Sequence, residues 1–483
     1  MEQPDQVSND PQAPRLVAGV DSSTQSCKVV VVDAATGEVV RTGRAAHPDG
    51  TSVDPARWWD AYLEATKDGL LDGVQAIAVG GQQHGMVALD ESGEVIRDAL
   101  LWNDTRSAQA ARDLTDELGG VSAWVDAVGM SPLPSFTITK VRWLAEHEPD
   151  NAARVADVVL PHDWLTGQIL KQGNGFERWV TDRSDASGTC YFDSVGNAYR
   201  SDLQRMALGR EFGVPHVVGP HEVAGRTEAG LVVGPGAGDN AGAALGLGLQ
   251  RGDVVVSLGT SGAVFADAAE PVRDERGLIA SFASASGAHL PLMATLNAAR
   301  VLTAAAQLLG TDLAGLDRLA LAAEAGAGGL TLLPYLDGER SPNLPDATGT
   351  LGGLTRTNAT PENLARAAVE GMLANLVAGV DDLRHLGLPV ERVVLIGGAS
   401  ASAAVRAVAP GLFGVPVVVP APGEYVGLGA ARQAAWVLSG ADEPPDWSVA
   451  DEATLDPPKG DAAQGGAEVL ARYATLRDTL HRR

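Results

Sequence analysis

The sequence "VAGVDSSTQSCKVVVVDA" at residues 17–34 predicts two β-strands joined by a turn of small, hydroxyl-bearing residues. The stretch "VVVSLGTSGAVFADA" at residues 254–268 repeats this pattern. Thr24 and Thr260, the turn threonines, are separated by 236 positions, about half of the 483-residue chain. Two similar hairpins half a chain apart indicate a duplicated fold with a cleft between its halves.

Turns of this composition suit phosphate binding. Small side chains let the backbone approach a polyphosphate, while amide and hydroxyl groups donate hydrogen bonds to its oxygens. Either turn alone is also typical of an ordinary β-hairpin, and it is the pair that favours a phosphate site.

The bulk composition is that of a globular protein of two or three domains. Short strand-like runs alternate with helical stretches, which predicts an α/β fold. No apolar run approaches the length of a membrane span, and the first residues lack a signal pattern, so we expect a cytoplasmic protein with a disordered tail over 1–15. Cys27 and Cys190 are too few for a disulfide framework or a zinc site, and we expect both to be buried.

The net charge of −25 argues against nucleic acid or an anionic membrane as a partner, because such binding requires basic patches. We expect an N-terminal lobe over 16–245 that carries the first phosphate turn. A C-terminal lobe is expected over 246–440. Residues 441–483 are expected to form a Pro/Gly-rich surface excursion and a helix that docks on the body.

Two helices are well signalled within these lobes. Asp54 and Pro55 precede one of them, and Thr360 and Pro361 precede another that carries a long apolar stripe.

Asp239 is the strongest candidate for acid–base chemistry. It stands in "PGAGDNAGAALGLGL", after a glycine-rich turn and before a run that predicts a helix. A helix N-terminus favours the ionised carboxylate, so we expect Asp239 to stay ionised. The alternative is a plain helix-capping aspartate.

A third glycine-rich element, "RVVLIGGASAS" at residues 392–402, follows a late predicted strand. Glycines there let a flat ligand such as adenine lie against the backbone. The signal is weak alone, since the chain contains neither a Walker P-loop nor G-x-G-x-x-G.

Eight motifs in this order resemble the FGGY family of carbohydrate kinases, from about Val17 to Trp436. They are "GVDSSTQSCK", "GGQQHGMV", "LWNDTR", "DRSDASGTCYFD", "GAGDNAGAALGLG", "SLGTSGAV", "LPYLDGERSP" and "LIGGASAS". The resemblance implies the two-lobed fold of sugar kinases and actin, in which each lobe has a duplicated mixed-sheet core with flanking helices. The resemblance also implies that the N-terminal lobe binds the sugar and that the C-terminal lobe binds ATP. ATP and Mg²⁺ are the implied cofactors.

The resemblance also implies roles for individual residues. Asp239 would be the general base, and Asp21 would position Mg²⁺ through water. Sugar contacts would come from Gln83, His84, Trp102, Asp239 and Asn240. ATP contacts would come from Thr24, Gly259, Thr260, Gly397, Gly398 and Ala399. Asp104 and Arg106 are equally consistent with a structural ion pair, and Lys28 with a solvated strand residue.

The "GQQHG" and "TDRSDASGT" stretches favour D-xylulose as the sugar, with ribulose, gluconate or glycerol as alternatives. A chaperone-like, filament-forming or repressor relative is the alternative of another class. A homodimer is expected by analogy alone. Two positions depart from the family pattern: Ala399 stands where a third glycine is usual, and Gln83 where some members have methionine.

Overall fold

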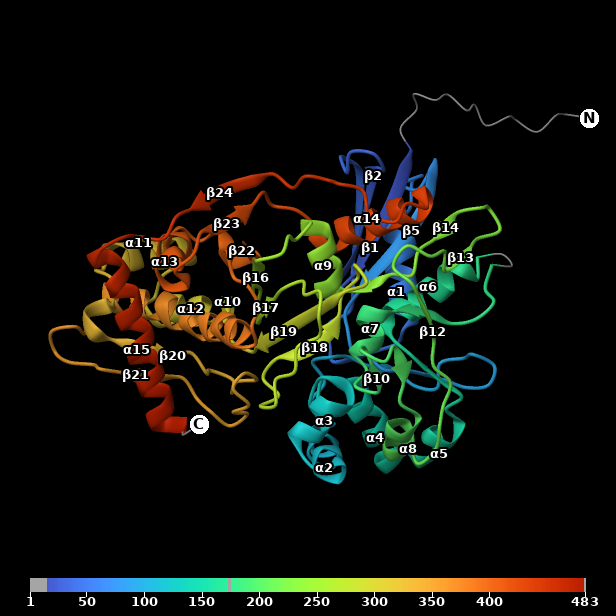
Figure 1. The fold of residues 1–483 in the computed structure, drawn as a ribbon, viewed down its shortest axis with the longest axis horizontal. Coiled ribbons are helices and arrows are strands. Elements are labelled where there is room, and N and C mark those ends of the chain that lie inside the picture. Colours follow the sequence, from blue (N-terminus) through green and yellow to red (C-terminus); the bar gives the residue numbers. More distant parts are fainter. Residues whose placement is uncertain (1–14, 173–174, 482–483) are drawn as a thin grey trace, which may run out of the picture.

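The computed structural model describes residues 15–172 and 175–481, so the expected tail lies almost entirely outside the described residues. It contains two seven-stranded mixed sheets, one in each half of the chain (Figure 1). The strands of the N-terminal sheet are β1 (Leu16–Ser22), β2 (Ser26–Asp33), β3 (Val39–Ala46), β5 (Val74–Gly81), β13 (Gly225–Arg226), β14 (Val232–Val233) and β15 (Ala237–Gly238). Those of the C-terminal sheet are β16 (Asp253–Leu258), β17 (Gly262–Phe265), β18 (Ala280–Ala283), β19 (His289–Thr295), β22 (Arg392–Ile396), β23 (Val417–Pro420) and β24 (Asp451–Leu455).

The two sheets share one topology, which confirms the duplication that the hairpins predict. The order β3-β2-β1-β5-β14 corresponds to β19-β17-β16-β22-β23. In both runs the first three strands pair antiparallel and the last three pair parallel. The α/β fold class and its two mixed-sheet lobes are therefore as expected.

Helices flank both sheets, and the described structure also contains five two-stranded sheets. The first half contains α1 (Ala56–Ala65), α2 (Ala108–Leu118), α3 (Val121–Val128), α4 (Thr137–His147), α5 (Pro149–Arg154), α6 (Pro161–Leu170), α7 (Arg183–Ser187), α8 (Ser201–Leu208) and α9 (Asp239–Leu247). The second contains α10 (Ala299–Leu308), α11 (Leu313–Ala322), α12 (Pro361–His385), α13 (Ala403–Phe413), α14 (Tyr425–Ser439), α15 (Asp461–His481) and the 3₁₀ turns η1 (Ala327–Gly329) and η2 (Gly398–Ala401). The small pairs are β4 (Ser52–Val53) with β7 (Ala99–Leu100), β6 (Val87–Leu89) with β8 (Asp157–Val159), β9 (Val180–Asp182) with β12 (His216–Val218), β10 (Phe192–Asp193) with β11 (Ala198–Tyr199), and β20 (Thr331–Leu333) with β21 (Thr350–Gly352).

The helix signals read from the sequence are confirmed. The Thr360 hydroxyl accepts a hydrogen bond from the Asn363 amide at the start of α12, and the Asp54 carboxylate accepts one from the Ala56 amide at the start of α1. Cys27 and Cys190 are both buried and free. None of the helices in the described part of the chain combines the length and apolar character needed to span a membrane.

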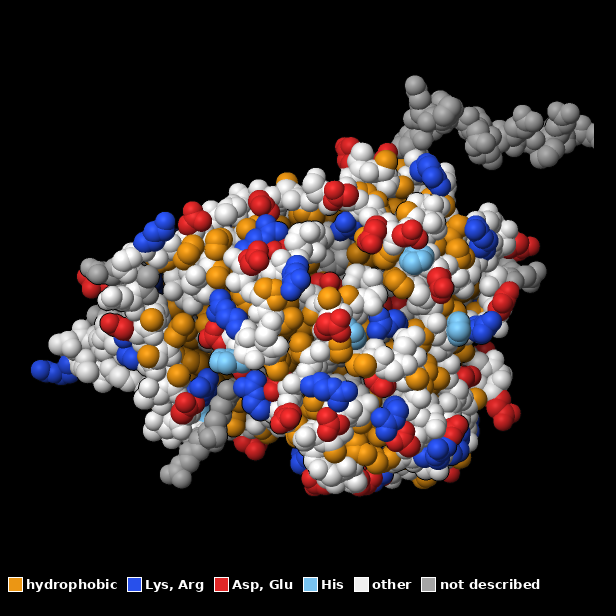
Figure 2. All heavy atoms as spheres, in the orientation of Figure 1, with side chains coloured by type: hydrophobic (Ala, Val, Ile, Leu, Met, Phe, Trp, Pro, Cys, Tyr) orange, Lys and Arg blue, Asp and Glu red, His pale blue; other side chains and the backbone are white. Residues whose placement is uncertain are grey.

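Acidic and basic side chains are distributed over the same surface. On the face that Figure 2 shows, the acidic and basic side chains of the described residues are interspersed. This face therefore lacks the continuous basic patch that binding of a polyanion requires.

Helices α9 and α14 lie side by side between the two sheets (Figure 1). Helix α14 comes from the C-terminal half, yet its residues Ala430, Ala431 and Ala434 pack on the N-terminal sheet. Helix α14, which lies within the expected C-terminal lobe, therefore completes the core of the N-terminal sheet. Glycines permit the crossing: a Cβ at Gly429 would lie 1.8 Å from the Gly242 carbonyl oxygen.

The segment expected to be a Pro/Gly-rich surface excursion, which begins at residue 441, contains a strand of the C-terminal sheet. β24 pairs antiparallel with β23 at the edge of the C-terminal sheet, and Trp447 is buried against the N-terminal core. The prolines and glycines of this segment therefore flank a strand that the sheet itself stabilises. Helix α15 buries Val469 and Tyr473.

The α9–α14 crossing predicts that Gly429→Ala destabilises the protein, because a methyl group has no space against the Gly242 carbonyl. Overpacking of this kind costs about 1–3 kcal/mol of the free energy of unfolding, which urea denaturation measures. Gly411→Ala in α13 is the control, since its Cβ would make only an ordinary 3.6 Å contact with Pro458. We expect the control to be neutral or stabilising by up to about 1 kcal/mol; equal effects of the two substitutions would contradict the close crossing.

Candidate active site

Three parallel strands end at one edge of the N-terminal sheet and bring distant motifs together. Asp21 on β1 lies opposite Gly80 on β5. Gly238 on β15 lies opposite Gly81, and Asp239 follows directly as the first residue of α9. The "GGQQHG" motif leaves β5 at the same edge. The carboxyl ends of parallel strands are the usual ligand-binding edge of an α/β sheet.

The loop before Asp239 is fixed by side chains from three elements. The Gly236 backbone exchanges two hydrogen bonds of 2.9 Å with the Gln433 amide of α14. The Gly238 amide donates to the Ser184 hydroxyl at 3.0 Å. His162 Nε2 contacts the Pro235 carbonyl oxygen at 3.2 Å. Asp239 therefore enters the site on a rigid backbone.

His162 belongs to a fully buried charged cluster beneath this loop. Its Nδ1 lies 2.5 Å from an Asp185 oxygen and 3.4 Å from an Asp163 oxygen. Burial lowers the pKa of His162, but the two carboxylates outweigh burial and raise it to about 10. The cluster is thus an imidazolium paired with carboxylates, and its bond to the Pro235 carbonyl gives it a structural function.

The carboxyl group of Asp239 has an unusual pKa. Both the backbone amide and the side-chain amide of Asn240 donate to one of its oxygens, at 2.7 and 2.8 Å. Burial, together with the nearby charge of Asp21, raises the pKa of Asp239 to about 7, although the Asn240 bonds oppose the shift. The expectation that the helix N-terminus keeps Asp239 fully ionised was therefore wrong, because desolvation dominates.

Asp21 and Lys28 face each other across the first hairpin. Burial raises the pKa of Asp21 to about 6, and Lys28 opposes the shift. The Lys28 ammonium lies 3.6 Å from Asp21 and 2.6 Å from Glu424, so the reading of Lys28 as a solvated strand residue was wrong. The Oδ1 atom of Asp21 is buried without a hydrogen-bond partner in the described structure.

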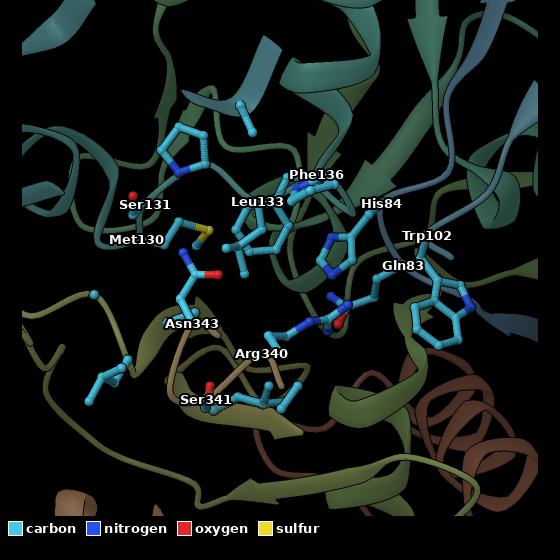
Figure 3. Close-up of a pocket in the computed structure, with 18 of the residues that line it drawn as sticks. Gln83, His84, Trp102, Met130, Ser131, Leu133, Phe136, Arg340, Ser341 and Asn343 are labelled. Atoms are coloured by element: carbon cyan, nitrogen blue, oxygen red, sulfur yellow. The ribbon is translucent and has the colours of Figure 1, made fainter. Parts of the chain in front are cut away.

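A cleft of about 650 Å³ opens above this edge (Figure 3). Residues from both halves of the chain line it. Of the sequence-predicted residues it brings together Gln83, His84, Trp102, Asp239, Asn240 and Gly259. Asp21 and Thr24 lie beside it: Asp21 acts on the pKa of Asp239, and the Thr24 hydroxyl accepts a 2.9 Å hydrogen bond from the Trp102 indole.

His84 is held as a neutral acceptor. Its Nδ1 lies 2.8 Å from the Gly188 carbonyl oxygen, which can only accept, so Nδ1 carries the proton and Nε2 is left as an acceptor. Burial lowers the pKa of His84 to about 3. The ring faces the cleft in Figure 3 beside Gln83, whose amide donates to the Ser184 carbonyl. A neutral imidazole of this kind suits a ligand hydroxyl.

The glycine-rich turns of the C-terminal half lie at the ends of β16 and β22. The Gly259 carbonyl accepts a hydrogen bond from the Ala299 amide at the start of α10, and Thr260 is exposed. Gly397 has φ +91°, and a Cβ there would collide with the Leu258 backbone. Gly398 faces open space, whereas the Ala399 methyl group is buried in the C-terminal core. The departure at Ala399 therefore leaves the exposed surface of this turn unobstructed.

Other cleft residues were missed, among them three from a segment whose motif was noted in part. Arg340, Ser341 and Asn343 line the cleft from the segment "GERSPN". The sequence marks this segment only by a charged pair, Glu339 and Arg340, between a glycine and a proline. It has no helical or strand periodicity that would have pointed to a site. Asp104 and Arg106, in contrast, form a 2.8 Å ion pair outside the cleft lining.

The sequence matches two domains of one family. Residues 16–247 match the N-terminal domain of the FGGY family of carbohydrate kinases, and residues 254–438 match its C-terminal domain. The chain belongs to the FGGY family of carbohydrate kinases. The resemblance stated from the motifs is thus confirmed.

Relatives of this FGGY kinase are similar along most of their length. A xylulose kinase from Streptomyces coelicolor is 45% identical over 467 residues, which cover 93% of this chain and 94% of the relative. A xylulose kinase from Streptomyces rubiginosus is 45% identical over 88% of this chain and 89% of its own. The crystal structure of xylulose kinase from Bifidobacterium adolescentis superposes with a TM-score of 0.87 at 46% identity, covering 94% of this chain and 99% of that one.

The burial of Asp239 predicts a carboxyl group that titrates near pH 7, far above the usual value for aspartate. Carbon-13 NMR of protein labelled at the aspartate carboxyl carbons measures this titration, and the resonance absent from Asp239→Asn identifies the group. In Asp21→Asn the midpoint should fall, because a negative charge that raises the pKa is removed. A midpoint near 4 in the unmodified protein would rule out the desolvated environment.

Proposed function

We propose that this FGGY kinase transfers the γ-phosphoryl group of ATP to D-xylulose and forms D-xylulose 5-phosphate. One observation carries the proposal: Asp239, with its pKa near 7, lies in one cleft with Gln83 and His84 and with the second glycine-rich turn. The xylulose kinases that are 45% identical to the chain support D-xylulose over ribulose, gluconate or glycerol.

Asp239 acts as the general base in this proposal. Phosphoryl transfer needs a carboxylate that accepts the proton of the attacking hydroxyl. A base is most effective when its pKa lies near the working pH, because it is then both sufficiently ionised and sufficiently basic. The two Asn240 hydrogen bonds hold one carboxylate oxygen, so the other is free to face the sugar hydroxyl.

The two hairpin turns bind the phosphates. Thr24 in the first turn, and Gly259 and Thr260 in the second, present hydroxyl and backbone amide groups to them. Gly397, Gly398 and Ala399 form the turn on which the adenosine rests, since the surface above Gly398 is open.

Asp21 fits a magnesium ion that it would hold through water. Its buried Oδ1 atom has no hydrogen-bond partner among the described residues, and carboxylate oxygen is a ligand that Mg²⁺ prefers. When bound, Mg²⁺ neutralises charge on the ATP phosphates. Lys28 and Glu424 fix the orientation of Asp21 relative to α14.

The proposal predicts the order of activity in a panel of acceptors. With ATP and Mg²⁺, D-xylulose should give the highest kcat/KM, above D-ribulose, gluconate and glycerol. A coupled assay of ADP formation, with mass spectrometry of the sugar phosphate, measures each value. Preference for another acceptor would refute D-xylulose as the substrate, and sugar-independent ATP hydrolysis alone would refute the kinase proposal.

Asp239→Asn should lower kcat by about 10²- to 10⁴-fold, because the amide keeps the shape of the side chain but cannot accept a proton. In the unmodified enzyme kcat/KM should rise with pH through about 7, since Asp239 is protonated and inactive below its pKa. The variant should lose this dependence while its melting temperature stays unchanged. Asp442→Asn, at an exposed position, is the matched control. A folded Asp239→Asn enzyme with normal turnover would exclude Asp239 as the base.

A further inference from the structure

Arg340 crosses the cleft from the C-terminal half of the chain. Its guanidinium carbon lies 5.9 Å from the centre of the Trp102 ring, which belongs to the N-terminal half. In Figure 3 the side chain points toward Gln83 and Trp102 from the opposite wall. Its charge also contributes to the lowered pKa of His84. Arg340 thus reaches the same part of the cleft as Gln83 and His84.

The backbone that carries Arg340 is held by the buried carboxylate of Glu339. That carboxylate accepts hydrogen bonds from the amides of Leu296 and Arg340, at 2.6 and 2.7 Å. It also accepts hydrogen bonds from the side chains of Asn297 and Asn375, at 3.0 and 3.1 Å. These four hydrogen bonds fix the backbone at Arg340 and therefore the point at which its side chain enters the cleft.

The donors of the Arg340 guanidinium remain available to a ligand. Within residues 15–172 and 175–481 the guanidinium forms neither an ion pair nor a hydrogen bond, and its ring contact is with Trp102 alone. A guanidinium offers five N–H donors and no acceptor. Its neighbour His84 offers an acceptor at Nε2. A ligand between them must therefore both accept and donate, as the carbonyl and hydroxyl groups of a sugar do.

We propose that Arg340 is a substrate-binding residue that donates hydrogen bonds to oxygens of the sugar opposite Gln83 and His84. Sugar binding then connects the two halves of the chain, because the N-terminal half supplies His84 and the C-terminal half supplies Arg340. The inference rests on the proposed function and adds to it a cationic sugar contact from the C-terminal half of the chain.

Calorimetry of D-xylulose binding to Arg340→Met in the absence of ATP tests this assignment. The dissociation constant should rise by about 10- to 100-fold, the range for losing a hydrogen bond from a charged donor. The KM for D-xylulose should rise in parallel, while the dissociation constant of ATP and the melting temperature should not change. Arg340→Lys keeps the charge but loses the planar fork. Its dissociation constant for D-xylulose should therefore lie between those of the unmodified enzyme and Arg340→Met.

Arg356→Met is the matched control, because Arg356 is an exposed arginine of the same half. Unchanged D-xylulose affinity in Arg340→Met, or a loss confined to ATP affinity, would overturn the inference. Turnover of D-xylulose by the unmodified enzyme tests the proposed function separately. If that enzyme phosphorylates a different acceptor, calorimetry with that acceptor applies the same criterion to Arg340.

Discussion

The contact on which this structure depends is the backbone crossing of α9 and α14. A side chain at Gly429 would collide with the Gly242 carbonyl, and one at Gly246 would collide with the Tyr425 carbonyl. Helix α9 begins in the cleft with Asp239, and α14 begins directly after Glu424, whose carboxylate pairs with Lys28. The glycines thus let the first turns of α14 pack closely on α9, although the two helices come from opposite halves of the chain. Bulkier residues would separate them and open the site.

The same crossing sets the electrostatics of the cleft. Asp21 is buried and Asp239 lies deep in the cleft, and this desolvation raises the pKa of each well above the usual value for aspartate. Lys28 opposes the shift at Asp21, and Glu424, which holds Lys28, reaches it from the start of α14. One end of α14 therefore affects the charge of Asp21, while Gln433 farther along fixes the loop before Asp239.

Much of the fold could be predicted from sequence because its signals are local. Two hairpins with the same turn chemistry indicated the duplication, and motif order indicated the family. The packing of α14 on the first sheet could not be predicted, since an alanine-rich helix carries no mark of which sheet it covers. β24 was missed because its pairing with β23, rather than its composition, makes it a strand.

The candidate site, like the fold, could be predicted from the sequence only in part. Motifs placed Asp239, Gln83 and His84 correctly in one cleft, because strand ends of a parallel sheet share an edge. The pKa of Asp239 depends on desolvation by groups that are distant in sequence, and no local pattern contains that information. Arg340 was missed for a related reason: only folding brings it opposite Trp102.

The position of α14 also fixes when the first lobe can finish folding. The face of the N-terminal sheet that includes Val17, Val32 and Ala78 is covered by residues 430–437, which are synthesised long after the strands of that sheet. Until those residues leave the ribosome, this apolar face has no partner from its own chain. The core of the first sheet is therefore completed only after most of the second sheet has been made, and a nascent chain that stops before α14 exposes an apolar sheet face to aggregation and to chaperones.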